Sequence, residues 1–262
     1  LVVFDLNRAA IEDLVKAGAL PAGSSKEVAE RAEVVITGPV SEHSGWRSAP
    51  ADVVRISADA DGQALGVGET VLLELARLHA ETRFRKTVRF VAFTLEEPPF
   101  FRSRYMGSRI YTYWLKERGD QIEAMLCLES VGYYSREPGS QSFPFPLFWL
   151  RWRYPTTGNF ITIVSNDDSQ PLQTQVRDGL VAHMNLPVET YAGPWWIPGV
   201  DWSDHGSFWN EGYPAVMLTD TAPFRNPHYH RPTDLPDTLD YRAMSELVHG
   251  LAGALVTLDE RR

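Results

Sequence analysis

Apolar residues recur along the chain with two different periods, which predicts alternating strands and helices. Short apolar runs rich in β-branched residues are typical of buried strands, whereas apolar positions at i, i+3, i+4 and i+7 are typical of helices packed on a sheet. Residues 69–81 show the helical spacing at Val71, Leu72, Leu75 and Leu78. Strands are predicted at 33–37, 52–57, 87–93, 122–128, 160–164 and 215–218, and helices at 11–17, 69–81, 108–118, 171–184 and 242–258.

Strands separated by helices predict an α/β fold. We expect a three-layer α-β-α arrangement, with a mostly parallel mixed sheet and helices on both faces. A Gly-rich turn at 61–68 precedes one predicted helix, Gly119 closes another, and the Pro- and aromatic-rich stretch 133–155 is predicted to be a loop. Because no repeat or linker interrupts the 262 residues, a single domain over 1–262 is expected.

The composition limits the classes of partner that the protein could bind. With 25 basic and 34 acidic residues the net charge is −9, which argues against nucleic acid or an anionic membrane as partner. The single cysteine, Cys127, lies in an apolar run and is predicted to fill the core. No run approaches the roughly 20 apolar residues that span a bilayer, and the start has no basic segment of a signal peptide. A cytoplasmic protein is expected.

Two adjacent acids, Glu96 and Glu97, follow the predicted strand 87–93, and Pro98-Pro99 stops that strand. Ligand crevices of open α/β sheets lie at the carboxyl ends of strands, where this pair is placed. In such a pair one carboxylate can bind a metal while its neighbour accepts a proton from an attacking water. A solvated pair at a strand end is the alternative interpretation.

Three further segments offer candidate ligands. Glu129 follows an apolar run, Asp204-His205 lies in a Trp-Ser-Asp-His segment, and His228 and His230 flank Tyr229. His228 and His230 are two positions apart, so in an extended segment they face the same way. A capped loop acid and structural histidines remain the alternatives for these residues.

In combination and order, these segments resemble the zinc aminopeptidases of the bacterial leucyl aminopeptidase type, a superfamily that also contains the single-zinc glutaminyl cyclases. The similar segments, within residues 50–260, are 72–77, 87–97, 106–108, 128–132, 202–205 and 227–234. The resemblance implies that Glu96 is a general base and Glu97 a zinc ligand. It further implies that Glu129 binds a second metal and that His230 shares its metal with Glu97.

Other positions depart from the family pattern. If Val53-Val54 lies on the family's strand, Ala58 replaces a zinc-binding His and Ala60 the Asp that orients it. If Gly68 opens the next helix, the bridging Asp is replaced by Ala64.

A catalytic zinc usually has three protein ligands, and these departures leave fewer at either position. No metal is therefore expected, although a reshaped loop would bring Asp59 or Asp61 into range. If one ion is bound, its predicted ligands are Glu97, His230 and Asp61.

Three hypotheses remain. The favoured one is a metal-independent enzyme in a biosynthetic pathway, with a partner subunit, that performs ring closure, acyl or amine chemistry on an amino-acid-like or amide substrate. Crowded carboxylates without zinc would have raised pKa values, which suits such proton transfer. The second is a pseudoenzyme subunit that stabilises a paralogue, and the third is a single-zinc aminopeptidase or cyclase with Glu96 as base. The expected catalytic residues are Glu96, Glu129, Asp204 and His230, and the expected substrate contacts are Glu97, His205, Tyr229 and Trp195.

Aromatic residues cluster in the predicted loops, at 100–101, 133–134, 143–152 and 195–196. They would form either a wall of the substrate pocket or the core of a protein interface, where Tyr, Trp and Phe are enriched. Residues 143–150 are unusually apolar for a loop, so we expect them to be buried in a homo- or hetero-oligomer.

Overall fold

The computed structural model describes residues 67–93, 95–145 and 147–260, together with three two-residue strands nearer the N-terminus. The predicted helix at 11–17, the strand at 52–57 and most of the turn at 61–68 lie outside the described residues. The helices are α3 (Val67–Leu78), α4 (Gly107–Arg118), α5 (Gln170–His183), α6 (His205–Asn210) and α7 (Tyr241–Glu260), with 3-10 turns η1 (Phe148–Trp152), η2 (Ala222–Phe224) and η3 (Pro236–Thr238). The strands are β1 (Val2–Val3), β2 (Leu20–Pro21), β3 (Val35–Ile36), β4 (Val91–Ala92), β5 (Met125–Leu128), β6 (Ile161–Ser165), β7 (Val188–Ala192) and β8 (Ala215–Thr219).

Four strands form the central sheet, in the order β5-β8-β6-β7. β5 pairs parallel with β8, and β6 parallel with β7, whereas β6 and β8 run antiparallel. β3 and β4 form a separate parallel pair, as do β1 and β2. The sheet is therefore mixed, as predicted from the sequence.

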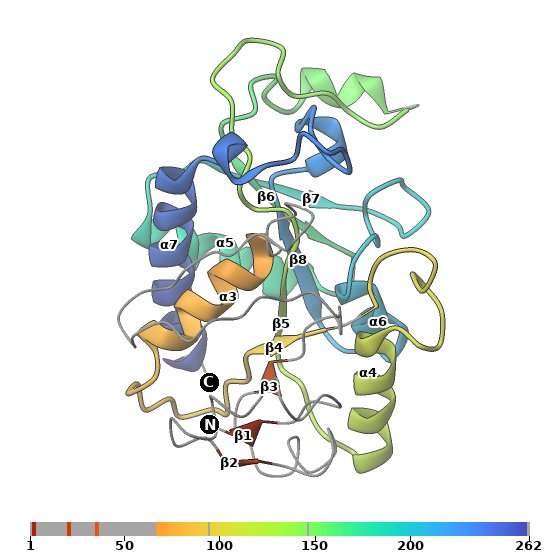
Figure 1. Ribbon diagram of the computed structural model, residues 1–262, viewed down its shortest axis with the longest axis vertical. Coiled ribbons are helices and arrows are strands. Elements are labelled where there is room, and N and C mark those ends of the chain that lie inside the picture. Colours follow the sequence, from red (N-terminus) through yellow and green to blue (C-terminus); the bar gives the residue numbers. More distant parts are fainter. Residues whose placement is uncertain are drawn as a thin grey trace.

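Side chains of β8 point alternately to the two faces of the sheet, which explains the three layers. Val216 and Leu218 belong to a large core with residues of α3, α5 and α7, whereas Met217 packs beside Cys127 on the opposite face. Successive side chains of a strand point to opposite faces, so one strand serves both layers. Figure 1 shows α3, α5 and α7 on one side of the sheet and α4 and α6 on the other. The predicted α-β-α architecture is confirmed, and Cys127 is buried as expected.

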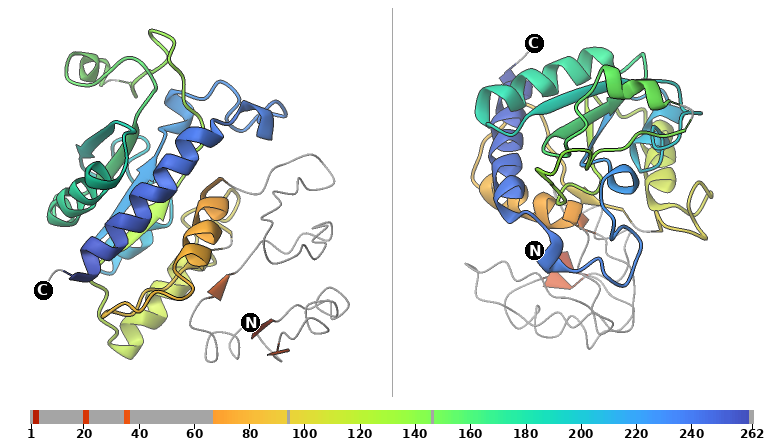
Figure 2. Two further views of the ribbon diagram at one scale, coloured as in Figure 1. Left: turned by 90° about the vertical axis from the view of Figure 1, so that its left-hand side faces the viewer. Right: turned by 90° about the horizontal axis from the view of Figure 1, so that it is seen from above.

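Two glycines fix helix ends near the sheet. Gly119 adopts a left-handed φ of 71°, and its N–H bonds the carbonyls of Leu115 and Lys116, which ends α4 where the sequence predicted. Gly68 lies in the first turn of α3, where an added Cβ would stand 2.3 Å from the Leu128 carbonyl oxygen. Only glycine allows this approach, which places the start of α3 against the end of β5 (Figure 2).

The structure also corrects several predicted bounds. The helix expected at 69–81 runs from Val67 to Leu78, and only Val91–Ala92 of the strand expected at 87–93 is paired as a strand. β7 and the short helix α6 were not predicted. β7 consists of half-buried residues rather than an apolar run, and six-residue α6 is too short to show a helical period. Within the described residues, no helix combines the length and apolar character needed to cross a bilayer.

Candidate functional site

Carboxylates gather near the ends of β4 and β5 and the start of α6. Glu96 lies four residues after β4, Glu129 directly follows β5, and Asp204 immediately precedes α6. Glu69, in the first turn of α3, is a fourth member, because its charge acts on the pKa of each of these three acids. The structure thus brings together the acids predicted from separate segments and adds one that the sequence analysis did not name.

Glu96 has the most perturbed titration in this group. Burial, followed by the charges of Glu129, Asp204 and Glu97, raises its pKa to about 9. Both causes disfavour the ionised form, since burial removes water and like charges repel. In this arrangement the Glu96 carboxyl is protonated at neutral pH.

Glu129 is held by two serine hydroxyls. Ser130 donates to Oε1 at 2.9 Å, and Ser203 donates to Oε2 at 2.8 Å. Burial raises the pKa of Glu129, and these two hydrogen bonds oppose the rise. Ser130 has a left-handed φ of 49°, a conformation that non-glycine residues rarely adopt. The chain thus accepts some backbone strain immediately beside this acid.

In the part of the chain that the structure describes, Asp204 has fewer hydrogen-bond partners than Glu129. Its Oδ1 atom is buried and has no hydrogen-bond partner among the described residues. Burial raises the pKa of Asp204 to about 7, opposed by a contact with the Ser108 hydroxyl. Buried carboxylate oxygens are usually paired, so this atom departs from the usual pattern among the described residues.

Glu97 and His230 meet at the outer edge of the acid group. Glu97 Oε1 lies 3.2 Å from His230 Nε2, although the two residues are 133 positions apart in the chain. The His230 ring stacks on Tyr229, with ring centroids 4.0 Å apart, and its φ is 56°. Tyr229 is half-buried, and its pKa is raised by burial and then by Glu129 and Glu97. The pair and Tyr229 therefore border the same crevice.

Two predicted substrate contacts, His205 and Trp195, lie away from the acids and the pocket, and one predicted metal ligand falls outside the described residues. The His205 imidazole is fully buried, with Nε2 donating to the Val200 carbonyl at 2.7 Å, and it packs edge-on to Trp209. Burial lowers the pKa of His205 to about 4, so the ring is neutral and part of the core. Trp195 is 67% exposed and does not line the pocket described below, whereas Trp202 does. Asp61 lies outside the described residues.

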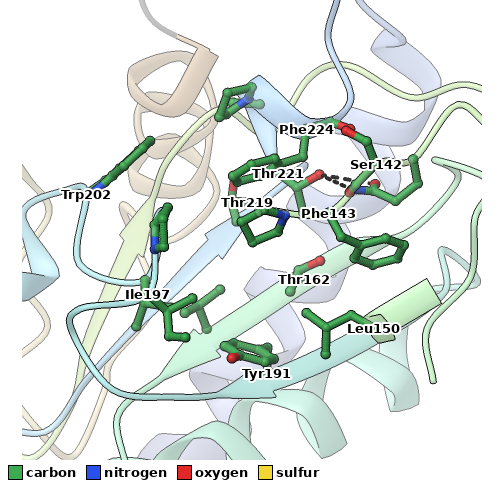
Figure 3. Close-up of a pocket in the computed structure, with 18 of the residues that line it drawn as sticks. Ser142, Phe143, Leu150, Thr162, Tyr191, Ile197, Trp202, Thr219, Thr221 and Phe224 are labelled. Carbon is green, nitrogen blue, oxygen red and sulfur yellow. Dashed lines mark hydrogen bonds between the residues drawn. The ribbon is translucent and has the colours of Figure 1, made fainter. Parts of the chain in front are cut away.

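An apolar pocket adjoins the acids. Its cavity volume is about 130 Å³, and Glu129 and Tyr229 line both the pocket and the crevice. The floor is the sheet face formed by β6, β7 and β8, and the walls come from the 141–154 segment, the 197–202 loop and η2 (Figure 3). The predicted aromatic wall is thus present in part, through Phe143.

The described His, Cys, Asp and Glu side chains do not provide the ligands that a zinc ion requires. In the described part of the chain, no three His, Cys, Asp or Glu side chains are grouped so that they could hold a metal. Glu97 and His230 form a pair, whereas both oxygens of Glu129 already accept hydroxyl hydrogen bonds. The described donors therefore fall short of the three protein ligands of a typical catalytic zinc.

The sequence analysis missed Glu69, Ser130 and Ser203. A signal existed for Glu69, which directly follows the glycine that opens α3. Ser203 gave none, because its hydroxyl, 74 positions from Glu129, is recognisable as a partner only after folding.

Comparison with known proteins shows a match to one protein family. Residues 51–254 match the profile of peptidase family M28. Over 200 residues the chain is 40% identical to the uncharacterized protein YfbL of Escherichia coli (strain K12), covering 76% of this chain and 60% of that protein.

Two solved structures are similar in fold. LapA aminopeptidase of Legionella pneumophila is 18% identical with a TM-score of 0.55, covering 74% of this chain and 46% of its own. BSAP, a zinc aminopeptidase from Bacillus subtilis, is 18% identical with a TM-score of 0.52, covering 75% and 42%. The chain thus spans 60% of the length of the curated relative and less than half of either solved structure.

Proposed function

The chain belongs to peptidase family M28, and from this premise we propose that it acts on the amine or amide group of an amino-acid-like molecule, with Glu96 as the proton-transferring residue. One observation carries the proposal. The apolar pocket adjoins the acid group, because Glu129, one of these acids, and Tyr229, whose pKa the acids raise, both line it. Such a site accepts a molecule with a polar amide end and a largely apolar side chain.

The protonation state of Glu96 determines the order of events. Its pKa of about 9 makes it an acid first. As water or the substrate's own amine bonds to the carbonyl carbon, Glu96 gives its proton to the nitrogen that leaves. The bond between that nitrogen and the carbonyl carbon breaks, and the Glu96 carboxylate then accepts the proton that the attacking group has lost. Protons balance, and general acid–base catalysis of this kind contributes about 10²–10⁴-fold.

The neighbouring groups position the substrate in this proposal. When water is the attacking group, the carboxylates of Asp204 and Glu97 accept from the substrate's protonated amine, whose positive charge offsets the crowding of acids; when the amine itself attacks, it does so in its neutral form. Glu129, already held by Ser130 and Ser203, keeps its orientation and adds negative charge beside the amine. Within the described residues, no three of these donors are grouped so that they could hold a metal.

A second candidate function is supported by the spacing of Glu97 and His230. Zinc bonds of about 2.0–2.2 Å in tetrahedral geometry hold neighbouring ligands roughly 3.3–3.6 Å apart. The observed 3.2 Å between Oε1 and Nε2 fits two ligands of one ion. A third ligand would have to come from outside the described residues, and Asp61 is our candidate. The alternative is a single-zinc enzyme of the aminopeptidase or glutaminyl cyclase kind.

Glu96→Gln tests the proposal. The probes are L-aminoacyl amides and a peptide with N-terminal glutamine, and ammonia release is followed with mass spectrometry to separate hydrolysis from ring closure. We expect the variant to lose about 10²–10⁴-fold in turnover while unfolding at the same urea concentration or a higher one. Glu117→Gln, an exposed acid on α4, is the matched control.

Four outcomes decide between the alternatives. Turnover that is equal in wild type and Glu96→Gln contradicts the proposal, and no turnover of any probe favours a non-catalytic subunit. Turnover that is lost on chelation and restored by zinc favours the single-zinc enzyme instead. Stoichiometric zinc that survives dialysis would support the same conclusion.

A further inference from the structure

A row of polar residues crosses the floor of the apolar pocket. In the sheet register, Thr219 of β8 pairs with Thr162 of β6, and Thr162 pairs with Glu189 of β7. Glu129 extends the row on β5, since its N–H donates to the Leu218 carbonyl at 3.0 Å, one residue beyond the Leu128–Leu218 pair. All four residues line the pocket. The row therefore leads from the acid crevice to Glu189 at the far strand.

Two groups in this row lack partners. Thr162 is 7% exposed, and its Oγ1 atom has no hydrogen-bond partner among the described residues. The Glu189 carboxylate is half-buried and forms no hydrogen bond or ion pair within the part of the chain that the structure describes. By contrast, Thr219 Oγ1 accepts from the Thr221 N–H at 2.9 Å. Figure 3 shows Thr162 between the side chains of Tyr191 and Thr219 in the lining.

The next row of the sheet is different. Met217, Val164 and Tyr191 are paired across the same three strands and also line the pocket. Leu150, Ile197 and Phe143 add apolar walls. A ligand in this pocket therefore meets apolar surface along its length and one carboxylate at the far end. Burial of Glu189 without a paired cation is unfavourable, which an incoming positive charge would relieve.

The length of the row sets the length of the ligand. Three strand spacings separate Glu129 from Glu189, or about 14 Å between Cα atoms. Because side chains stand roughly perpendicular to a sheet, the two carboxylates are separated by about the same distance, and contacts of about 2.9 Å at each end leave roughly 8 Å for the ligand itself. This exceeds the reach of a short side chain and suits a long one that ends in a cation.

We infer that Glu189 is a specificity residue that selects a substrate whose side chain has an apolar stem and a terminal guanidinium, with the Thr162 hydroxyl as a second acceptor. A guanidinium is favoured over an ammonium because its planar donors match a carboxylate and a neighbouring oxygen together. The exposed Arg153 is the competing cation. Its charge lowers the pKa of Glu189 against the larger effect of burial, but no ion pair joins the two. This inference rests on the proposed function, since the substrate's amine must lie at the acid crevice.

Binding of three ligands by isothermal titration calorimetry tests the inference. L-arginine amide carries the cation, L-citrulline amide has nearly the same shape without the charge, and L-norleucine amide has only the apolar stem. We expect arginine amide to bind at least about tenfold more tightly than the other two. Glu189→Gln should remove that advantage and leave norleucine amide unchanged, whereas Glu137→Gln, an exposed acid outside the pocket, should change neither.

Thr162→Val keeps the size of the side chain and removes its hydroxyl. A smaller loss, confined to arginine and citrulline amides, is expected. Equal affinity for arginine and norleucine amides in the wild type, or an arginine preference that survives in Glu189→Gln, overturns the inference and leaves the proposed function standing. If none of the three amides binds, both the inference and the proposed function fail.

Discussion

Asp220 and Glu96 are both shielded acids near the end of a strand, yet their surroundings differ. Asp220 is the more deeply buried, at 2% exposed, but accepts three backbone N–H groups, from Gly132, Tyr133 and Ala222, at 3.0, 2.7 and 2.8 Å. Burial raises its pKa to about 7, against about 9 for Glu96, which faces other carboxylates instead of donors.

The difference shows that burial alone does not produce a reactive acid. Backbone N–H donors stabilise a buried carboxylate as a hydrogen-bond acceptor that links two segments. In this case Asp220 links the loops after β5 and β8. Neighbouring acids without donors leave a carboxyl protonated and ready to give up its proton. The two kinds of site should therefore respond in opposite ways to loss of the charge.

Asp220→Ala should have the largest effect. It leaves three buried N–H groups without an acceptor and removes the nearest negative charge from the buried Arg225, which we expect to cost about 3–5 kcal/mol of unfolding free energy. Urea unfolding measures this loss. Asp220→Asn retains one acceptor oxygen and should lose less, whereas Glu96→Gln should lose nothing. Equal destabilisation by Asp220→Ala and Glu96→Gln would remove the distinction.

Acid should destabilise the protein through His205. Its folded pKa of about 4 lies below the usual 6.5, so its contribution is complete above pH 6.5 and is lost as the pH falls through 4. The difference between the usual and the folded pKa of His205 corresponds to about 3 kcal/mol of unfolding free energy. Urea midpoints at pH 7 and pH 4.5 should fall less in His205→Gln than in the wild type. His249→Gln, exposed on α7, should retain the wild-type fall.

Ser203→Ala should leave Glu129 with fewer hydrogen-bond donors, as at Glu96, and so raise its pKa. It removes the donor at 2.8 Å from Oε2, so the pKa of Glu129 should rise further and the unfolding free energy should fall by about 1 kcal/mol. Urea unfolding gives the second quantity and titration of the carboxyl by NMR gives the first. Ser130→Ala removes the donor to Oε1 and is the paired control; an unchanged pKa in both variants would show that the hydroxyls do not hold the acid.

The smallest effect on stability is expected in the 143–152 segment. Phe145 and Trp152 are 85% and 79% exposed, so Trp152→Ser should change the unfolding free energy by less than about 0.5 kcal/mol. If the segment is an oligomer interface, as its composition predicts, sedimentation of the wild type should show dissociation on dilution and the variant should sediment as a monomer throughout. Trp114→Ser, 54% exposed on α4, should behave as wild type; a wild type that is monomeric at every concentration contradicts the interface.

Local signals predicted most elements of the sheet and its helices. The apolar spacing of residues 242–258 corresponds to α7, and Gly119 marked the end of α4, because both signals depend only on nearby residues. β7 was missed because it is half-buried along its length and so carries no continuous apolar run.

The candidate site was predicted in part. Glu96 and Glu129 each follow a strand that was predicted, so their shared location could be predicted from the topology of α/β sheets, whereas Asp204 precedes α6, which was not predicted. Neither the burial of His205 nor the hydroxyl pair around Glu129 could be predicted, since both depend on contacts between distant segments. The loss of metal ligands inferred at Ala58, Ala60 and Ala64 lies outside the described residues and stays a prediction.

The position of β7 at the end of the central sheet has a consequence for how such proteins diverge. Each strand added to or removed from that side would lengthen or shorten the cavity floor by about 4.8 Å, because that is the spacing between neighbours. Substitutions in the last strand alone would change its terminal group. The preferred length of the ligand could therefore change in steps at the β7 edge of the sheet. The acids that transfer protons, at the opposite edge, would remain unchanged.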